Sequence, residues 1–194
     1  MKKVSLTILP PSIIIKVIST LLTACYCLLP TFLSAQFTNL WTQTNNPGSG
    51  SDVAYAMTAD ASGIYVAGWD GSGGTRWRIE KRDLTTGALI NSFGTAGVVT
   101  SNPSAGADYI YAIIATASGI YVAGYDDSPG NTQWRIEKRD LTTGSLICEV
   151  TKNPSVYGDY AEAIAADTSG IYVAGYDYIP GVGDSQWRME KYDL

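Results

Sequence analysis

The sequence predicts an all-β protein, and two observations carry that prediction. One segment, Ser-Gly-Ile-Tyr-Val-Ala-Gly, occurs three times in the 194-residue chain. The stretches between its Asn-Pro and Gly-rich turns are short and strand-like, and none has helical periodicity over a useful length. A composition of 45% hydrophobic and 16% charged residues is that of a folded protein.

The three copies share an order of parts. Each has an Asn-Pro turn, an Asp that leads an apolar run, the shared segment, an aromatic residue followed by Asp, a Gly-rich loop, and Trp-Arg-(Ile or Met)-Glu-Lys. The shared segment occupies residues 62–68, 118–124 and 169–175. In the middle copy we expect four strands, at residues 109–116, 119–125, 133–140 and 145–151.

Four short antiparallel strands about every 50 residues, joined by tight turns, are typical of one blade of a β-propeller. Residues 109–114, Tyr-Ile-Tyr-Ala-Ile-Ile, are apolar on both faces, as a sheet covered on both sides requires. We therefore expect residues 36–194 to be a β-propeller repeat domain of about three four-stranded units of 51–57 residues. The approximate units are 37–86, 87–143 and 144–194.

Residues 163–176 read Ala-Ile-Ala-Ala-Asp-Thr-Ser-Gly-Ile-Tyr-Val-Ala-Gly-Tyr, and residues 191–193 read Lys-Tyr-Asp. These motifs resemble the repeat of secreted bacterial β-propellers of the seven-bladed type. Phe-Gly-Thr-Ala-Gly-Val at 93–98 resembles the delta-60 repeat, and Asp-Leu-Thr-Thr-Gly at 83–87 and 140–144 is similar to a turn of quinoprotein-like propellers. The resemblance covers about residues 38–194 and implies the fold, which hosts many activities.

Three units are fewer than the four to eight blades that close a propeller, so we expect an incomplete ring or one completed by oligomerisation. The chain stops at Leu194, where the other copies continue into Thr-Thr-Gly, which favours a fragment of a longer propeller. The alternative is a symmetric pair of chains, in which residues 37–44 of one chain pair with the last blade of the other.

Residues 1–35 are expected to be a signal peptide, because Lys2 and Lys3 precede an uncharged, mostly apolar stretch. Two alternatives remain open. The stretch could stay in the membrane as an anchor, or Leu-Thr-Ala-Cys ending at Cys25 could be a lipobox. All three place the rest of the chain outside the cytoplasm, with the N-terminal segment as its membrane contact.

Composition excludes several classes of chemistry. The chain has no histidine, so Ser-His-Asp and Cys-His catalysis and His-ligated metals are absent. Its formal net charge is −5, and without the three lysines of the first 36 residues it is −8. Such an acidic body has no means of holding a phosphate backbone, so we expect no nucleic-acid partner.

Three repeated side chains are expected to have packing roles. The Arg and Glu of each Trp-Arg-x-Glu motif share a strand face and are expected to pair across blade interfaces, while the Trp fills the core between blades. These residues are Trp77, Arg78 and Glu80; Trp134, Arg135 and Glu137; and Trp187, Arg188 and Glu190. Cys148 is expected to be a small buried residue in a strand, because Leu146 and Val150 flank it at alternate positions.

The function expected is that of a non-enzymatic exported module, a scaffold for interaction with an unidentified protein or glycan. Aromatic and acidic residues at the ends of the shared segments are the expected contacts. They are Trp69, Asp70, Tyr125, Asp126, Asp127, Tyr176 and Asp177. No catalytic or metal site is expected, and calcium at the Asp-headed loops is the remaining cofactor alternative. The alternative function is part of a quinoprotein-like or hydrolytic propeller enzyme whose catalytic residues lie in absent blades.

Overall fold

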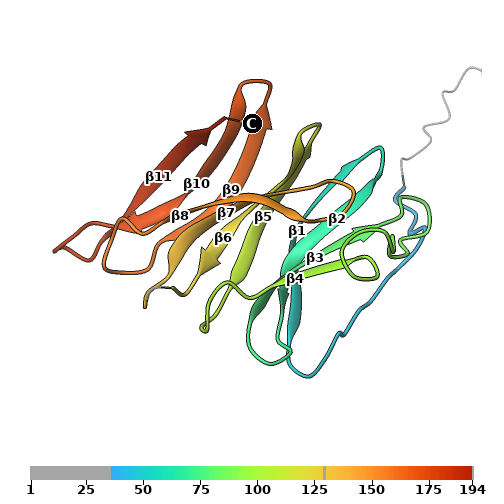
Figure 1. Cartoon of the computed structure of the whole chain (residues 1–194), viewed down its shortest axis with the longest axis horizontal. Coiled ribbons are helices and arrows are strands. Elements are labelled where there is room, and N and C mark those ends of the chain that lie inside the picture. Colours follow the sequence, from blue (N-terminus) through green and yellow to red (C-terminus); the bar gives the residue numbers. More distant parts are fainter. Residues whose placement is uncertain (1–35, 129, 194) are drawn as a thin grey trace, which may run out of the picture. The chain divides into compact units, whose positions relative to one another are not determined.

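The computed structural model describes residues 36–128 and 130–193 (Figure 1). The expected signal peptide, anchor and lipobox at Cys25 lie outside these residues. The chain divides into two units after Asn39, and the structure described below is that of the second, residues 40–194. Its described residues contain eleven β-strands and no helix, which confirms the all-β prediction.

The strands form three antiparallel sheets in which chain neighbours are also sheet neighbours. The first sheet consists of β1 (Asp52–Asp60), β2 (Gly63–Asp70), β3 (Arg76–Arg82) and β4 (Val98–Ser101). The middle sheet consists of β5 (Tyr109–Thr116), β6 (Gly119–Asp126), β7 (Gln133–Arg139) and β8 (Leu146–Lys152). The last sheet consists of β9 (Tyr160–Asp167), β10 (Gly170–Tyr178) and β11 (Ser185–Tyr192).

The strands of the middle sheet begin and end within one residue of the expected positions. The prediction of four strands in every unit is confirmed for two sheets, whereas the last sheet has three strands among the described residues. Each sheet is open, and the described part of the chain forms no closed ring.

Equivalent residues of the three copies have equivalent backbone partners. Val66 pairs with Glu80, Val122 with Glu137, and Val173 with Glu190. The first strand of each sheet also contains a β-bulge at the same position, next to its pairing with a glycine of the following strand. The repeated sequence therefore specifies a repeated strand register.

Each sheet presents two different faces, because side chains alternate along a strand. One, here called the Trp face, carries Tyr65, Ala67, Trp77 and Ile79 in the first sheet; Tyr121, Ala123, Trp134 and Ile136 in the middle sheet; and Tyr172, Ala174, Trp187 and Met189 in the last. The opposite Arg face carries Ile64, Val66, Arg78 and Glu80; Ile120, Val122, Arg135 and Glu137; and Ile171, Val173, Arg188 and Glu190.

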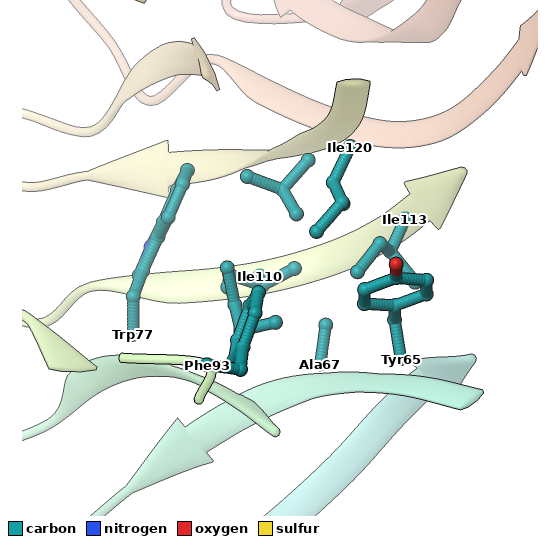
Figure 2. Close-up of a cluster of buried hydrophobic side chains, with 9 residues drawn as sticks. Tyr65, Ala67, Trp77, Phe93, Ile110, Ile113 and Ile120 are labelled. Carbon is teal, nitrogen blue, oxygen red and sulfur yellow. The ribbon is translucent and has the colours of Figure 1, made fainter. Parts of the chain in front are cut away.

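The core lies between the sheets, where the Trp face of one packs on the Arg face of the next. Figure 2 shows side chains of the first sheet, including Trp77 and Tyr65, meeting Ile110, Ile113 and Ile120 of the middle sheet. A second cluster joins Trp134 and Ile136 of the middle sheet to Ala161, Ile171 and Val173 of the last. The same interface is thus built twice in the chain (Figure 1).

The expectation that every repeated Trp fills a core is correct for two copies and wrong for the third. Trp77 and Trp134 are 1% and 0% exposed, whereas Trp187 is 95% exposed. The difference arises because no sheet covers the Trp face of the last sheet within the described residues.

The expectation for Cys148 is correct in its strand and wrong in its burial. Cys148 lies in β8, as expected, but it is an exposed free thiol. Strand β8 is the edge of the middle sheet, and Leu146 and Ile147 beside Cys148 are exposed as well.

Candidate binding surface

The three aspartates at or next to the end of the second strand of each sheet are buried and ion-paired. Asp70, Asp126 and Asp177 are between 0 and 4% exposed. Each carboxylate lies beside the Arg of the adjacent strand, with N–O distances of 3.5 Å for Arg78–Asp70, 3.3 Å for Arg135–Asp126 and 2.9 Å for Arg188–Asp177. These three aspartates, which the sequence suggested as ligand contacts, therefore stabilise the ends of hairpins. Asp127 is the one aspartate among the suggested contacts that is exposed.

The surroundings of Asp70 show how such a carboxylate stays ionised. Burial acts to raise its pKa, but hydrogen bonds from Arg76 and from the backbone N–H of Ser72, at 3.0 Å each, outweigh burial. The pKa of Asp70 is consequently below its ordinary value, and its charge is already balanced.

The repeated Arg–Glu pairs run along one strand, and the expectation that they cross between sheets is wrong. In β7, Glu137 is fully buried and accepts hydrogen bonds of 2.7 Å from both Arg135 and Arg139. Residues two apart on a strand lie on the same face, which brings these groups together. The group that does cross is the guanidinium: Arg135 lies over the ring of Trp77 at 5.9 Å, and Arg188 over Trp134 at 5.7 Å.

The aromatic residues indicated by the sequence belong to a larger set of touching rings, here called the tyrosine row. Its members are Tyr55, Trp69, Tyr109, Tyr111, Tyr125, Tyr157, Tyr160, Tyr176 and Tyr178. Between sheets, Tyr55 meets Tyr111 at 5.2 Å and Tyr125 meets Tyr160 at 5.0 Å, measured between ring centroids. The row therefore extends over all three sheets.

The exposure of the row varies along its length. Tyr55 and Tyr157 are 49% and 46% exposed, and Tyr125 is buried at 9%. The remaining rings are partly exposed. Rings that are packed on one side by neighbours and open on the other present rigid aromatic surface at little entropic cost.

Three residues at the equivalent bulges give the row its particular shape. Tyr55, Tyr111 and Glu162 are the extra residues of the bulges in β1, β5 and β9 and have no partner in the strand register. A β-bulge bends the strand and re-aims its side chain, and such bulges are frequent next to functional sites. The bulges thus turn two tyrosines and one carboxylate toward the row.

A glycine stands opposite each bulge and permits the close approach of the two strands. A Cβ atom added to Gly124 would lie 1.9 Å from the carbonyl oxygen of Tyr109, and Gly68 and Gly175 have the same close contact in the other sheets. Any side chain there would push the strands apart. The last Gly of each shared segment therefore helps to position the bulge residue.

Three tyrosines of the row have pKa values above the ordinary value of the phenol group. Burial, and then the neighbouring tyrosines Tyr160 and Tyr178, raise the pKa of Tyr176 to about 12. Burial also raises the pKa of Tyr111 and Tyr125. The negative charge of Glu162 contributes to the shifts of Tyr111 and Tyr176, which places this exposed carboxylate in the electrostatic range of the row. Tyr111, Tyr125 and Tyr176 thus offer neutral hydroxyl groups near the carboxylate of Glu162.

Two further aspartates, which lead the apolar runs, are buried near like charges. Asp108 and Asp159 are 0% exposed, and burial, opposed by hydrogen bonds from Ser104 and Ser155, raises their pKa values with a contribution from Asp126 and Asp177. Each accepts a side-chain hydrogen bond from its serine, at 2.6 Å and 2.9 Å. Both carboxyl groups stabilise, through these hydrogen bonds, the turn that precedes the first strand of their sheet.

Among residues 36–128 and 130–193, no three His, Cys, Asp or Glu side chains gather into a group that could hold a metal ion. The same residues contain no helix capable of crossing a membrane. Neither the family models nor the curated proteins compared with the chain give a match. The candidate site is therefore defined by its own geometry, the tyrosine row with Glu162.

Proposed function

We propose that the three sheets are blades of a β-propeller and that the chain is a non-enzymatic, exported binding module. Three observations support the blades: the repeated register, the twice-built interface between a Trp face and an Arg face, and the chain-order packing of antiparallel sheets. The resemblance of the repeats to secreted bacterial propellers supports export.

The tyrosine row is the observation that carries the binding function. It joins residues far apart in the chain, from Tyr55 to Tyr178, into one set of rings, and several of these rings are open to solvent. The aspartates beside the row are engaged in ion pairs, which leaves the rings and Glu162 as the groups that meet a ligand.

A glycan chain is the ligand that this surface fits best. Sugar rings have apolar C–H faces that lie against aromatic rings, and hydroxyl groups that pair with tyrosine hydroxyls and carboxylates. An elongated row suits a chain of several sugars. The acidic body and the nearby Glu162 disfavour polyanionic glycans, so we propose a neutral polysaccharide.

Binding of neutral oligosaccharides tests this function. Linear hexasaccharides of glucose, xylose and N-acetylglucosamine are titrated into the full chain by isothermal calorimetry. We expect one of them to bind, and Tyr55→Ala and Tyr111→Ala each to weaken binding by at least about fivefold, or about 1 kcal/mol.

Tyr172→Ala is the matched control. Tyr172 is 38% exposed but lies on the Trp face of the last sheet, outside the row. We expect this variant to bind as the unchanged chain does. Absence of binding to all three sugars, or equal loss in Tyr172→Ala and Tyr111→Ala, would contradict the proposed function.

A further inference from the structure

The Trp face of the last sheet exposes large apolar side chains on the adjacent strands β10 and β11. Trp187 is 95% exposed and Met189 79%, and Tyr172 beside them is 38% exposed. Their equivalents in the other two sheets are all buried in the clusters between sheets. These equivalents are Tyr65, Trp77 and Ile79 in the first sheet and Tyr121, Trp134 and Ile136 in the middle sheet. Monomeric proteins rarely leave such a contiguous apolar surface without a partner.

The two internal interfaces show what this face is built to meet. The indole N–H of Trp77 donates to the carbonyl oxygen of Tyr125 at 3.2 Å, and that of Trp134 donates to the carbonyl oxygen of Tyr176 at the same distance. In both cases the Arg of the next sheet lies over the indole ring. Each of these two tryptophans therefore packs on an Arg face, which supplies a backbone carbonyl oxygen for the indole N–H and a guanidinium over the indole ring.

The Arg face of the first sheet offers that arrangement unfilled. A pocket of about 210 Å³ is lined by Val53, Ala54, Gly68, Trp69 and Arg78, among others. These residues are the equivalents of Tyr160, Ala161, Gly175, Tyr176 and Arg188 in the last sheet, where Tyr176 accepts the indole hydrogen bond of Trp134 and Arg188 lies over its ring. An apolar cavity of about 150 Å³ holds a benzene molecule, so this pocket has room for an indole ring.

The position of residues 40–45 is a second, independent resemblance between the outer side of the first sheet and the internal interfaces. These residues belong to no strand, yet they lie along the first sheet as β4 lies along the middle sheet. Gln43 and the ring of Trp41 stand against Gly87, as Val99 and the ring of Phe93 stand against the equivalent Gly144, and Gln43 donates to the carbonyl oxygen of Thr86 at 3.1 Å. Residues 40–45 thus occupy the place of the outer strand of a preceding sheet.

We propose that a second copy of this chain docks its first sheet on the Trp face of the last sheet. Trp187 of one copy enters the pocket beside Arg78 of the other and donates to the carbonyl oxygen of Trp69. Residues 42–45 of the second copy add a strand to β11 of the first copy, which is an edge strand of the last sheet in the described structure.

The repeated register fixes how the added strand pairs. In the first sheet, Ile79 stands opposite Val99 and Arg78 opposite Thr100. In the middle sheet, Ile136 stands opposite Val150. The equivalent pairs between copies are Met189 with Gln43 and Arg188 with Thr44. The contact is head to tail, so two copies can make it twice in a symmetric pair, or more copies can continue it.

Solution mass tests the contact with a variant that leaves the fold intact. Trp187 is 95% exposed, so Trp187→Ala removes little contact within a chain. By light scattering, we expect the unchanged full chain to have twice the mass of one chain or more, and Trp187→Ala to have the mass of one chain. Val182→Ala, at a residue 65% exposed in the β10–β11 loop, is the control and should associate normally. A monomeric unchanged chain, or association unaffected by Trp187→Ala, would overturn the proposal.

A cysteine cross-link tests the register. In a background with Cys25, Cys27 and Cys148 replaced by Ser, a Gln43→Cys chain is mixed with a Met189→Cys chain and oxidised. We expect the mixture to form a disulfide-linked pair, and a mixture of Gln43→Cys with Val182→Cys to form at least tenfold less. Equal yields from the two mixtures would overturn the proposed pairing. Neither experiment depends on a glycan, so the outcome is separate from that of the proposed function.

Discussion

Trp134 and Trp187 occupy the same position of two sheets with nearly the same sequence, but their surroundings are opposite. Trp134 is fully buried, donates to a carbonyl oxygen of the next sheet and lies under Arg188. Trp187 is 95% exposed. The comparison shows that local sequence fixes strand and face in this protein, whereas the neighbouring sheet fixes burial.

The largest difference is expected when the two tryptophans are truncated. Trp134→Ala leaves a cavity between two sheets and should lower the free energy of unfolding by about 3–5 kcal/mol. Trp187→Ala should change the stability of the monomer by less than about 0.5 kcal/mol. Urea unfolding at a protein concentration too low for association measures both, and equal losses would contradict the comparison.

A smaller difference is expected between the glutamates of the same two sheets. Glu137 is 0% exposed and lies between Arg135 and Arg139, so Glu137→Gln leaves the buried Arg139 without its carboxylate partner, whereas Arg135 keeps Asp126 and Glu149. We expect a loss of about 3 kcal/mol. The Glu190 side chain is 17% exposed and faces Arg188, so Glu190→Gln should cost about 1 kcal/mol. Chemical unfolding of the two variants checks the order, and a larger cost at Glu190 would break the comparison.

The glutamate pair also predicts a pH effect in the last sheet. Burial acts to raise the pKa of Glu190, but hydrogen bonds from Tyr192 and Arg188 outweigh it and hold the pKa below 4.5, its ordinary value. A lowered pKa means that Glu190 stabilises the fold above pH 4.5 and that this stabilisation is lost as the pH falls below it. Glu190→Gln should therefore differ most from the unchanged chain near neutral pH and least in acid. Unfolding midpoints from pH 7 to pH ~3 measure this, and a gap that widens in acid would contradict it.

The last prediction concerns the tyrosine row at alkaline pH. Because burial and its neighbours raise the pKa of Tyr176 from 10.0 to about 12, the unfolded chain loses this proton before the folded chain does. Stability from this group is present below pH 10 and is lost between pH 10 and about 12. Tyr176→Phe should make the fall in the free energy of unfolding with rising pH less steep, by at most about 1.4 kcal/mol per pH unit. Thermal unfolding across this range tests it, and an unchanged slope would contradict it.

Much of the fold was predictable from the sequence because its signals are local. The apolar run before the shared segment and the turn residues around it were enough to place β5 at Tyr109–Thr116. The exposure of Trp187 and Cys148 was not predictable in this way, since both depend on whether another sheet or strand covers them.

The candidate site was predictable in part. Trp69, Tyr125 and Tyr176 directly follow the shared segments, and all three belong to the tyrosine row. The aspartates that follow them looked equally accessible in sequence, but Asp70, Asp126 and Asp177 each pair with the Arg of the next strand. An alternating pattern cannot show such cross-strand neighbours.

The bulge residues were missed because strict alternation assumes a regular strand. Tyr55, Tyr111 and Glu162 are extra residues in the register, and a bulge shifts the face on which a side chain emerges. The sequence contains no signal for the bulge, because this position carries Tyr, Tyr and Glu while neighbouring positions, such as that of Ala54, Ile110 and Ala161, vary as much.

Oxidation of tryptophan, followed residue by residue with mass spectrometry, tests the central claim most directly. In dilute solution we expect Trp187 to react first and Trp77 and Trp134 last, because one Trp face is open and two are covered. At high concentration, docking of a second copy should protect Trp187 and leave the order of Trp77 and Trp134 unchanged. If Trp187 were as protected as Trp134 in the dilute monomer, or if Trp134 reacted as fast as Trp187, burial would not be set by the neighbouring sheet and the account would be wrong.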